Sequence, residues 1–171
     1  MNSDLAVLLQ TLRETTAGMT EQQLDWHPEG KWSTAQILEH LNLSYAGTTR
    51  GLGMRLAEGK PKAKSLTLKN LIQQAVVLNL GYIPTGRKAP EMTTPKDCVD
   101  CKEIVNKTLT NLSEMAAKID EAQAKFGSSV RVLDHPVLGP FKVAQWPRFH
   151  RVHGLHHAKQ IERLKQMMPK S

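Results

Sequence analysis

A histidine-rich segment near the C-terminus restricts the fold of this chain more than any other part. Residues 146–164, WPRFHRVHGLHHAKQIERL, hold four of the seven histidines within eight residues. With about 100° per residue, a helix through this segment would gather one face about 80° wide from Trp146, His150, His153, His157, Gln160 and Leu164. Such a face is normally apolar. The pattern therefore predicts a helix over 147–166 whose inner face binds something, unless the segment is not a helix of this kind.

Two of these histidines have the spacing of a shared metal site. His153 and His157 are four residues apart, which places their Cβ atoms about 5–6 Å from each other on one helix face. This HxxxH pattern also arises by chance, so a metal site needs a third ligand from elsewhere. His150 lies one turn earlier on the same face. It is either a fourth ligand or pocket residue, or a residue that supports the ligands or lines the rim of the site. His156 projects about 100° away and is predicted to be a neighbour only.

The third ligand is predicted to lie on a helix over 33–49. Ser33 and Gln36 form a capping box, which marks the start of that helix. Its inward face has the i, i+3, i+4, i+7 spacing and consists of Ile37, His40, Leu41 and Ser44. A buried, hydrogen-bonded histidine is the ordinary interpretation of His40. Beside the HxxxH helix, however, His40 becomes the candidate third ligand.

The remaining segments predict a helical protein. Helices are expected over 3–17 and 67–80, and a longer one from Thr94 and Pro95 to about Ala124. A capping box at Thr20 predicts a short helical turn. Residues 51–66 and 127–141 are rich in turn signals and are expected to be loops, with no convincing strand. We therefore predict one domain over 1–171, an all-α four-helix bundle, for which up-down-down-up connectivity is one possibility.

Composition argues against several classes of protein. A hydrophobic content of 40% and a charged content of 23% are typical of globular proteins. No stretch has the roughly 20 apolar residues of a membrane span, and the N-terminal residues do not resemble a secretory signal, so we expect a cytoplasmic protein. The net charge of +7 is spread along the chain and only 5% of residues are aromatic, so we do not expect a nucleic-acid partner.

The two cysteines, Cys98 and Cys101, form a single CxxC pair. Zinc sites of this type usually need a second pair, and a thioredoxin-like motif needs a preceding strand. We predict that both cysteines are reduced bystanders.

Three histidines from two helices favour a catalytic type of metal site. Three neutral imidazoles hold a divalent ion and leave positions open for water or a substrate. Zinc makes bound water acidic and equally binds a thiolate. Imidazole also suits nickel and iron, so the residues alone do not choose the metal. Gln160 is placed to hydrogen-bond a ligand imidazole. Glu39 and Asp25 are the nearest carboxylates in the sequence, but nothing identifies either as a general base.

Three segments resemble the DinB/YfiT-like superfamily. They are MTEQQLDWHPEGKWSTAQILEHL at 19–41, PTGRKAPEM at 84–92 and HPVLGPFKVAQWPRFHRVHGLHHAKQI at 135–161. The last is similar to a branch known mainly as a domain of unknown function. The resemblance implies a four-helix bundle with a metal-binding histidine triad at His40, His153 and His157. It also implies homodimers and, in some members, transferase or isomerase activity with low-molecular-weight bacterial thiols.

We therefore expect a metal-dependent enzyme, a hydrolase or thiol S-transferase that uses zinc or nickel and a small-molecule substrate. The alternative is a helical bundle that binds metal without catalysis or whose histidines only pack. Apolar residues occur all along 68–80, more than one buried face needs, which predicts a homodimer.

Overall fold

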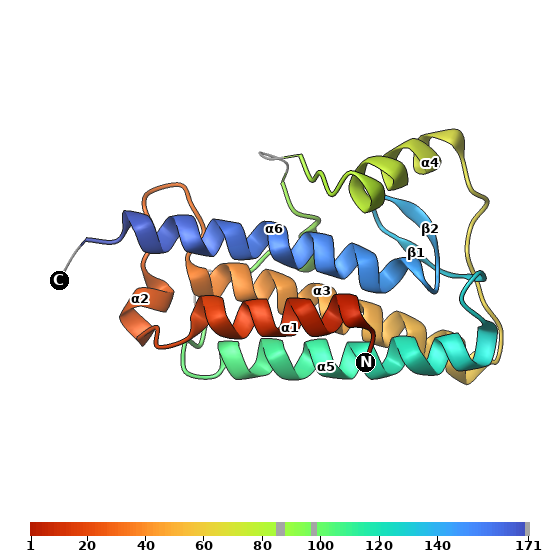
Figure 1. The fold of residues 1–171 in the computed structure, drawn as a ribbon, viewed down its shortest axis with the longest axis horizontal. Coiled ribbons are helices and arrows are strands. Elements are labelled where there is room, and N and C mark those ends of the chain that lie inside the picture. Colours follow the sequence, from red (N-terminus) through yellow and green to blue (C-terminus); the bar gives the residue numbers. More distant parts are fainter. Residues whose placement is uncertain (85–87, 97–98, 170–171) are drawn as a thin grey trace.

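Four long helices lie side by side along the length of the protein (Figure 1). The computed structural model describes residues 1–84, 88–96 and 99–169. The long helices are α1 (Ser3–Thr16), α3 (Thr34–Glu58), α5 (Ile104–Phe126) and α6 (Gln145–Met167). Helices α1 and α6 run in one direction and α3 and α5 in the other, so the connectivity is up-down-down-up. Helices α3 and α6 are antiparallel and in contact, and contact between them is what the predicted site requires.

Side-chain caps explain where two of the helices begin. Thr20 and Gln23 form a complete capping box before α2 (Glu21–Asp25), and Ser33 and Gln36 form another before α3. In each box the hydroxyl accepts from the backbone of the glutamine, and the glutamine side chain accepts from the backbone of the capping residue. Both capping boxes were predicted from the sequence. Ser33 places His40 two turns inside α3.

The prediction of an all-α four-helix bundle is wrong. Strands β1 (Arg131–His135) and β2 (Gly139–Lys142) form an antiparallel hairpin, with Leu133 opposite Phe141. The described residues also include the shorter helices α2 and α4 (Leu68–Gln74). The hairpin forms where 127–141 was predicted to be a loop, because Val132 and Phe141 are buried completely and Gly139 takes a positive φ of 75° at the turn.

Helix α4 packs its polar side against this hairpin. The buried Gln74 amide donates hydrogen bonds to the carbonyl oxygens of Leu138 (3.0 Å) and Pro140 (3.1 Å). Beyond α4 the chain continues as a π-helix, η1 (Ala75–Asn79). The other side of α4 is apolar yet exposed: Leu68 is 73% exposed and Ile72 58%. The predicted helical region over 67–80 is therefore present, with its apolar residues partly turned outward.

Two predicted boundaries are wrong. Helix α3 continues through the predicted loop at 51–66 as far as Glu58, because Leu52 is fully buried and Gly51 lies against Leu133 of β1. Helix α5 begins at Ile104, whereas a start at Thr94 was predicted. The described residues before it include a 3-10 turn, η2 (Glu91–Thr93).

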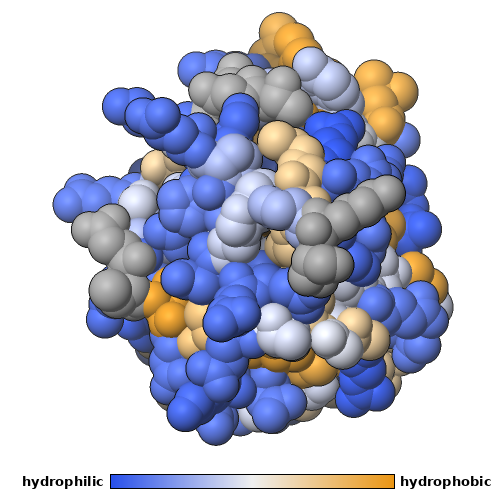
Figure 2. All heavy atoms as spheres, turned by 90° about the vertical axis from the view of Figure 1, so that its left-hand side faces the viewer, coloured by the Kyte–Doolittle hydropathy of each residue, from blue (hydrophilic) through white to orange (hydrophobic). Residues whose placement is uncertain are grey.

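The surface at the α2 end of the protein is mostly hydrophilic. Figure 2 shows apolar residues there in separate groups. Among the described helices, none is both long enough and apolar enough to cross a membrane.

Candidate metal centre

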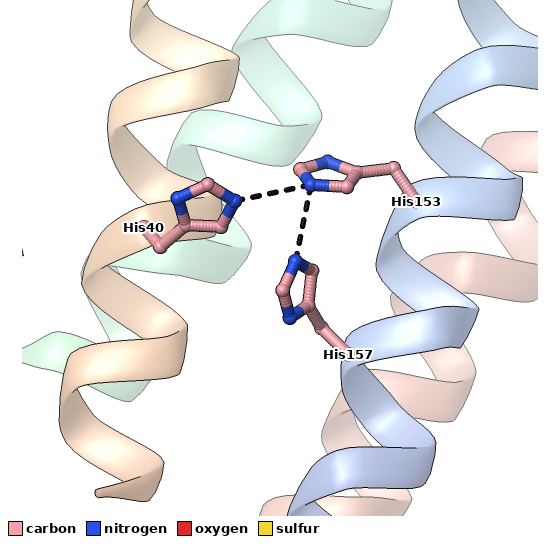
Figure 3. A group of neighbouring side chains, drawn as sticks. All are labelled: His40, His153 and His157. Carbon is pink, nitrogen blue, oxygen red and sulfur yellow. Dashed lines mark hydrogen bonds between the residues drawn. The ribbon is translucent and has the colours of Figure 1, made fainter. Parts of the chain in front are cut away.

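The structure brings the three predicted histidines together between α3 and α6 (Figure 3). His153 Nε2 lies 3.1 Å from His40 Nε2 and 3.1 Å from His157 Nε2. The three nitrogens lie within 4.8 Å of one another, in an arrangement that could hold a metal ion. His40 and His157 are buried, with 6% and 7% of their surface exposed, and His153 is half-buried.

The outer nitrogens of two rings are fixed by hydrogen bonds. His40 Nδ1 lies 2.7 Å from the carbonyl oxygen of Thr93, and His157 Nδ1 lies 2.8 Å from Gln160 Oε1. Because both oxygens accept, the two Nδ1 atoms carry the protons. The Nε2 atoms of His40 and His157 are therefore left with lone pairs that point toward His153.

This arrangement suits a cation. If His153 Nε2 carries the proton, its single N–H can point at only one of the two neighbouring lone pairs and leaves the other without a partner. If His153 Nδ1 carries the proton, both close contacts set lone pairs against each other. An ion at their meeting point removes that repulsion. With zinc–nitrogen bonds of about 2.0–2.1 Å, tetrahedral geometry separates ligand nitrogens by roughly 3.3 Å. The two observed separations of 3.1 Å are close to this value.

Burial keeps the three imidazoles neutral. Burial is the main cause that lowers the pKa of His40, places the pKa of His153 well below its usual value and lowers the pKa of His157 to about 3. The neighbouring histidines lower the pKa of His153 and His157 further. Neutral imidazole is the form that binds metals, so no proton has to leave before an ion binds.

Gln160 connects two histidines of α6. Its Oε1 accepts from His157 Nδ1, and its Nε2 donates to His156 Nε2 at 3.1 Å. The bond to His156 fixes which end of the amide faces His157. The structure thus places Gln160 where the sequence predicted, and His156 outside the group of three.

His150 belongs to the core next to the candidate site. Its ring is fully buried, and its Nε2 lies 3.0 Å from the hydroxyl of Thr48, which itself donates to the carbonyl oxygen of Ser44. His150 Nε2 must therefore be the donor in this pair. Among the described residues, the histidines close enough to share an ion are His40, His153 and His157. The structure therefore gives His150 a packing role rather than that of a fourth ligand.

Cys101 and two surface hollows lie away from the triad. Cys98 is outside the described residues, and Cys101 is half-buried, with a thiol pKa raised by burial and by Asp25 and other acidic neighbours. One hollow lies beside Cys101 and Glu21, and another beside Gly18 and Lys165. Neither is lined by a residue of the triad.

Sequence reasoning missed two contacts of His40. The Thr93 carbonyl reaches Nδ1 from a segment 53 positions away, and the Trp32 ring lies 5.3 Å from the imidazole, between ring centres. Nothing in the sequence indicates that Thr93 lies here, because a backbone carbonyl carries no residue signature.

One comparison with known proteins gave a match. A family model described as "Protein of unknown function (DUF1569)" matches residues 4–164, a range that contains all three histidines. Neither the curated proteins nor the solved structures gave a match.

Proposed function

We propose that this chain, which belongs to the DUF1569 family of proteins of unknown function, is a metal-dependent enzyme. His40, His153 and His157 would hold one divalent ion, zinc or nickel, and the substrate would be a small molecule. The observation that carries the proposal is that the Nε2 atoms of three neutral imidazoles converge on one point. In two of these rings, His40 and His157, the Nδ1–H group already donates to an oxygen. Purely structural histidines have no need to direct lone pairs at one another.

The reaction class follows from the donor set. When bound, the ion supplies a positive charge that makes water or a low-molecular-weight thiol acidic near neutral pH. Three neutral ligands leave that charge undiminished, while the Thr93 carbonyl and Gln160 hold two of the rings in place. We therefore propose a hydrolase or a thiol S-transferase. Such a transferase would work in the cytoplasm, where thiols stay reduced.

The thiol part of this proposal depends on a relation to the DinB/YfiT-like superfamily. It is supported by the sequence around His40 and by the 135–161 segment, which supplies the other two histidines.

Metal analysis is the first test. Protein purified without a histidine tag should contain about one divalent ion per chain, and treatment with a chelator should remove it. The metal-loaded protein is then assayed for thiol transfer and for hydrolysis, with the chelated protein as control. Metal content no higher than that of a His153→Ala variant would rule out the site.

A metal site without catalysis is the second candidate. It is favoured by the burial of His40 and His157, which limits the access of a substrate to the site. Cobalt(II) in place of the native ion separates the two candidates. If a thiol reaches the ion, a sulfur-to-metal charge-transfer band appears. A spectrum that no added thiol or anion alters would favour the non-catalytic site.

We also propose a homodimer in which α4 packs against a second copy. Leu68, Leu71 and Ile72 follow the i, i+3, i+4 spacing on the exposed side of α4, while the polar Gln74 faces inward. Residues 66–84 contain one charged side chain, Lys69, in a chain of net charge +7. Two copies can therefore meet here with little repulsion between like charges.

A further inference from the structure

The orientation of His40 depends on a segment outside its own helix. Residues 90–96 cross α3, and the carbonyl oxygen of Thr93 accepts from His40 Nδ1 at 2.7 Å. This bond decides which ring nitrogen is protonated, and it leaves Nε2 free to face His153. The position of the segment therefore controls whether His40 presents a lone pair to the metal centre.

The backbone of one residue, Lys96, attaches the far end of this segment to α3. Glu39 Oε2 accepts from the backbone N–H of Lys96 at 2.7 Å, and Gln36 Nε2 donates to the carbonyl oxygen of Lys96 at 3.3 Å. The other end of the Gln36 amide accepts from the backbone of Ser33 within the capping box. The cap of α3 and the two bonds to Lys96 thus form one network next to His40.

The segment's other hydrogen bonds give it shape without attaching it. The backbone N–H of Thr93 and the hydroxyls of Thr93 and Thr94 all donate to the carbonyl oxygen of Pro90. Within the described part of the chain, the recorded hydrogen bonds from residues 90–96 to other segments involve Gln36, Glu39 and His40. The bond to the Glu39 carboxylate is charge-assisted and shorter than the Gln36 bond, so it is the stronger of the two bonds at Lys96.

We propose that Glu39 is a positioning residue of the metal centre. By holding the backbone of Lys96, it keeps the Thr93 carbonyl on His40 Nδ1 and so fixes the ring with Nε2 unprotonated. The effect on metal affinity rests on the proposed function, whereas the effect on the His40 ring does not.

This role differs from that of a general base, the other role open to a carboxylate next to a metal ligand in the sequence. A general base must take up and release a proton, which a glutamine amide cannot do, so Glu39→Gln would abolish catalysis that depends on such a base. A positioning residue needs only an acceptor oxygen at this place, which the glutamine amide also supplies. Glu39→Gln should therefore behave like the wild type, and Glu39→Ala should not.

The first measurement is the protonation of the His40 ring in metal-free protein near neutral pH, read from long-range ¹H–¹⁵N correlations of the histidine rings. Wild type and Glu39→Gln should show the proton on Nδ1. Glu39→Ala should show a mixture of the two neutral forms. Glu91→Ala is the matched control. It removes an exposed carboxylate from the same segment, and no hydrogen bond of that carboxylate is recorded. An unchanged His40 signal in Glu39→Ala would overturn the proposal.

The second measurement is metal affinity by competition with a chromophoric chelator. Loss of an outer hydrogen-bonding partner typically weakens metal binding about 10- to 100-fold, so we expect about a 10-fold loss in Glu39→Ala, with Glu39→Gln and Glu91→Ala close to wild type. Equal losses in Glu39→Gln and Glu39→Ala would contradict the positioning role. If Glu39→Ala does not fold, Glu39→Asp makes the same test, because its shorter side chain withdraws the carboxylate from Lys96.

The two measurements separate this inference from the proposed function. If wild-type protein binds no metal, the proposed function fails, yet the ring measurement still decides the role of Glu39. If metal binds and the His40 proton is insensitive to Glu39→Ala, only the positioning role fails.

Discussion

At the scale of single residues, His153 occupies the centre of the triad. Its Nε2 is the nitrogen that lies 3.1 Å from both of the others. In His153→Ala only two imidazoles remain to bind zinc. The affinity should fall by more than about 100-fold, because losing an outer hydrogen-bonding partner alone already costs roughly 10- to 100-fold. His27→Ala, which removes an exposed loop histidine, should leave the affinity unchanged. Calorimetric titration with zinc checks both, and equal affinities in the two variants would contradict the site.

A second residue-scale prediction concerns acid stability. His135 Nδ1 accepts from the backbone N–H groups of Val137 and Leu138, and burial lowers the pKa of His135 from 6.5 to about 4. Between these pH values the unfolded chain binds a proton that the folded chain does not. This group's contribution to stability is therefore complete above pH 6.5 and falls by about 1.4 kcal/mol per pH unit as the pH drops toward 4.

Urea unfolding of metal-free protein at several pH values measures this effect. His135→Asn keeps an acceptor oxygen near the position of Nδ1 but cannot be protonated in this range. The variant should be less stable at neutral pH, because its side chain no longer packs on Phe141. Its stability should also fall less steeply with acid than that of the wild type. Parallel pH profiles for the two proteins would contradict the assignment.

The residues of the candidate site could be predicted from the sequence only in part. Helical spacing placed His153 beside His157, and the apolar spacing after the capping box at Ser33 placed His40 on the inward face of its helix. The same periodicity could not separate His150 from His153 and His157, because all three share one face of α6. Its bond to Thr48 depends on how α3 packs against α6, which periodicity does not specify.

At the scale of elements, Gly154 sets how closely α6 approaches α1. A Cβ atom at Gly154 would come within 2.3 Å of the fully buried Leu8 side chain. Alanine gains about 1 kcal/mol of helix propensity, but overpacking a core costs about 1–3 kcal/mol. We expect Gly154→Ala to lower the free energy of unfolding by about 1 kcal/mol.

A double-mutant cycle isolates this contact. In a Leu8→Ala background the clash is gone, so Gly154→Ala should stabilise the protein by about 1 kcal/mol. Gly47→Ala on α3 is the matched control, since a Cβ atom there meets nothing within 4 Å, and it should stabilise by a similar amount. The free energies come from urea unfolding. The same sign for Gly154→Ala in both backgrounds would contradict the packing described here.

Elements with local signals were predicted well, and those that depend on distant contacts were not. Both capping boxes form because each needs only four neighbouring residues. In contrast, Gly51 and Gly53 suggested a loop, yet α3 continues because Gly51 allows Leu133 of the hairpin to pack against it. Thr94 and Pro95 look like a helix start, but Thr94 donates to the carbonyl oxygen of Pro90 within the segment that crosses α3.

At the scale of the whole molecule, the connectivity follows from long connections. The chain between α3 and α5 returns along the protein, so the two helices run in the same direction. Near their starts Thr108 donates to the carbonyl oxygen of Leu38, and near their ends Lys125 donates to that of Leu56. The sequence left this connectivity open and missed the hairpin that joins α5 to α6. Carbonyl oxygens of the hairpin accept hydrogen bonds from Gln74 of α4. The polar side of α4 therefore faces the hairpin and its apolar side faces outward.

That outward surface leads to the last prediction. Leu68, Leu71 and Ile72 are between 48% and 73% exposed, a degree of exposure that association would relieve. Stable dimers bury about 1,200–2,000 Å² in total, and a carboxylate placed inside such an interface without a partner is costly. Light scattering at micromolar concentration should therefore give a dimer for the wild type and a monomer for Ile72→Glu. Val7→Glu adds the same charge at a 47% exposed position on α1 and should remain dimeric. A monomeric wild type would exclude the dimer, and a dimeric Ile72→Glu would show that the copies meet through another surface.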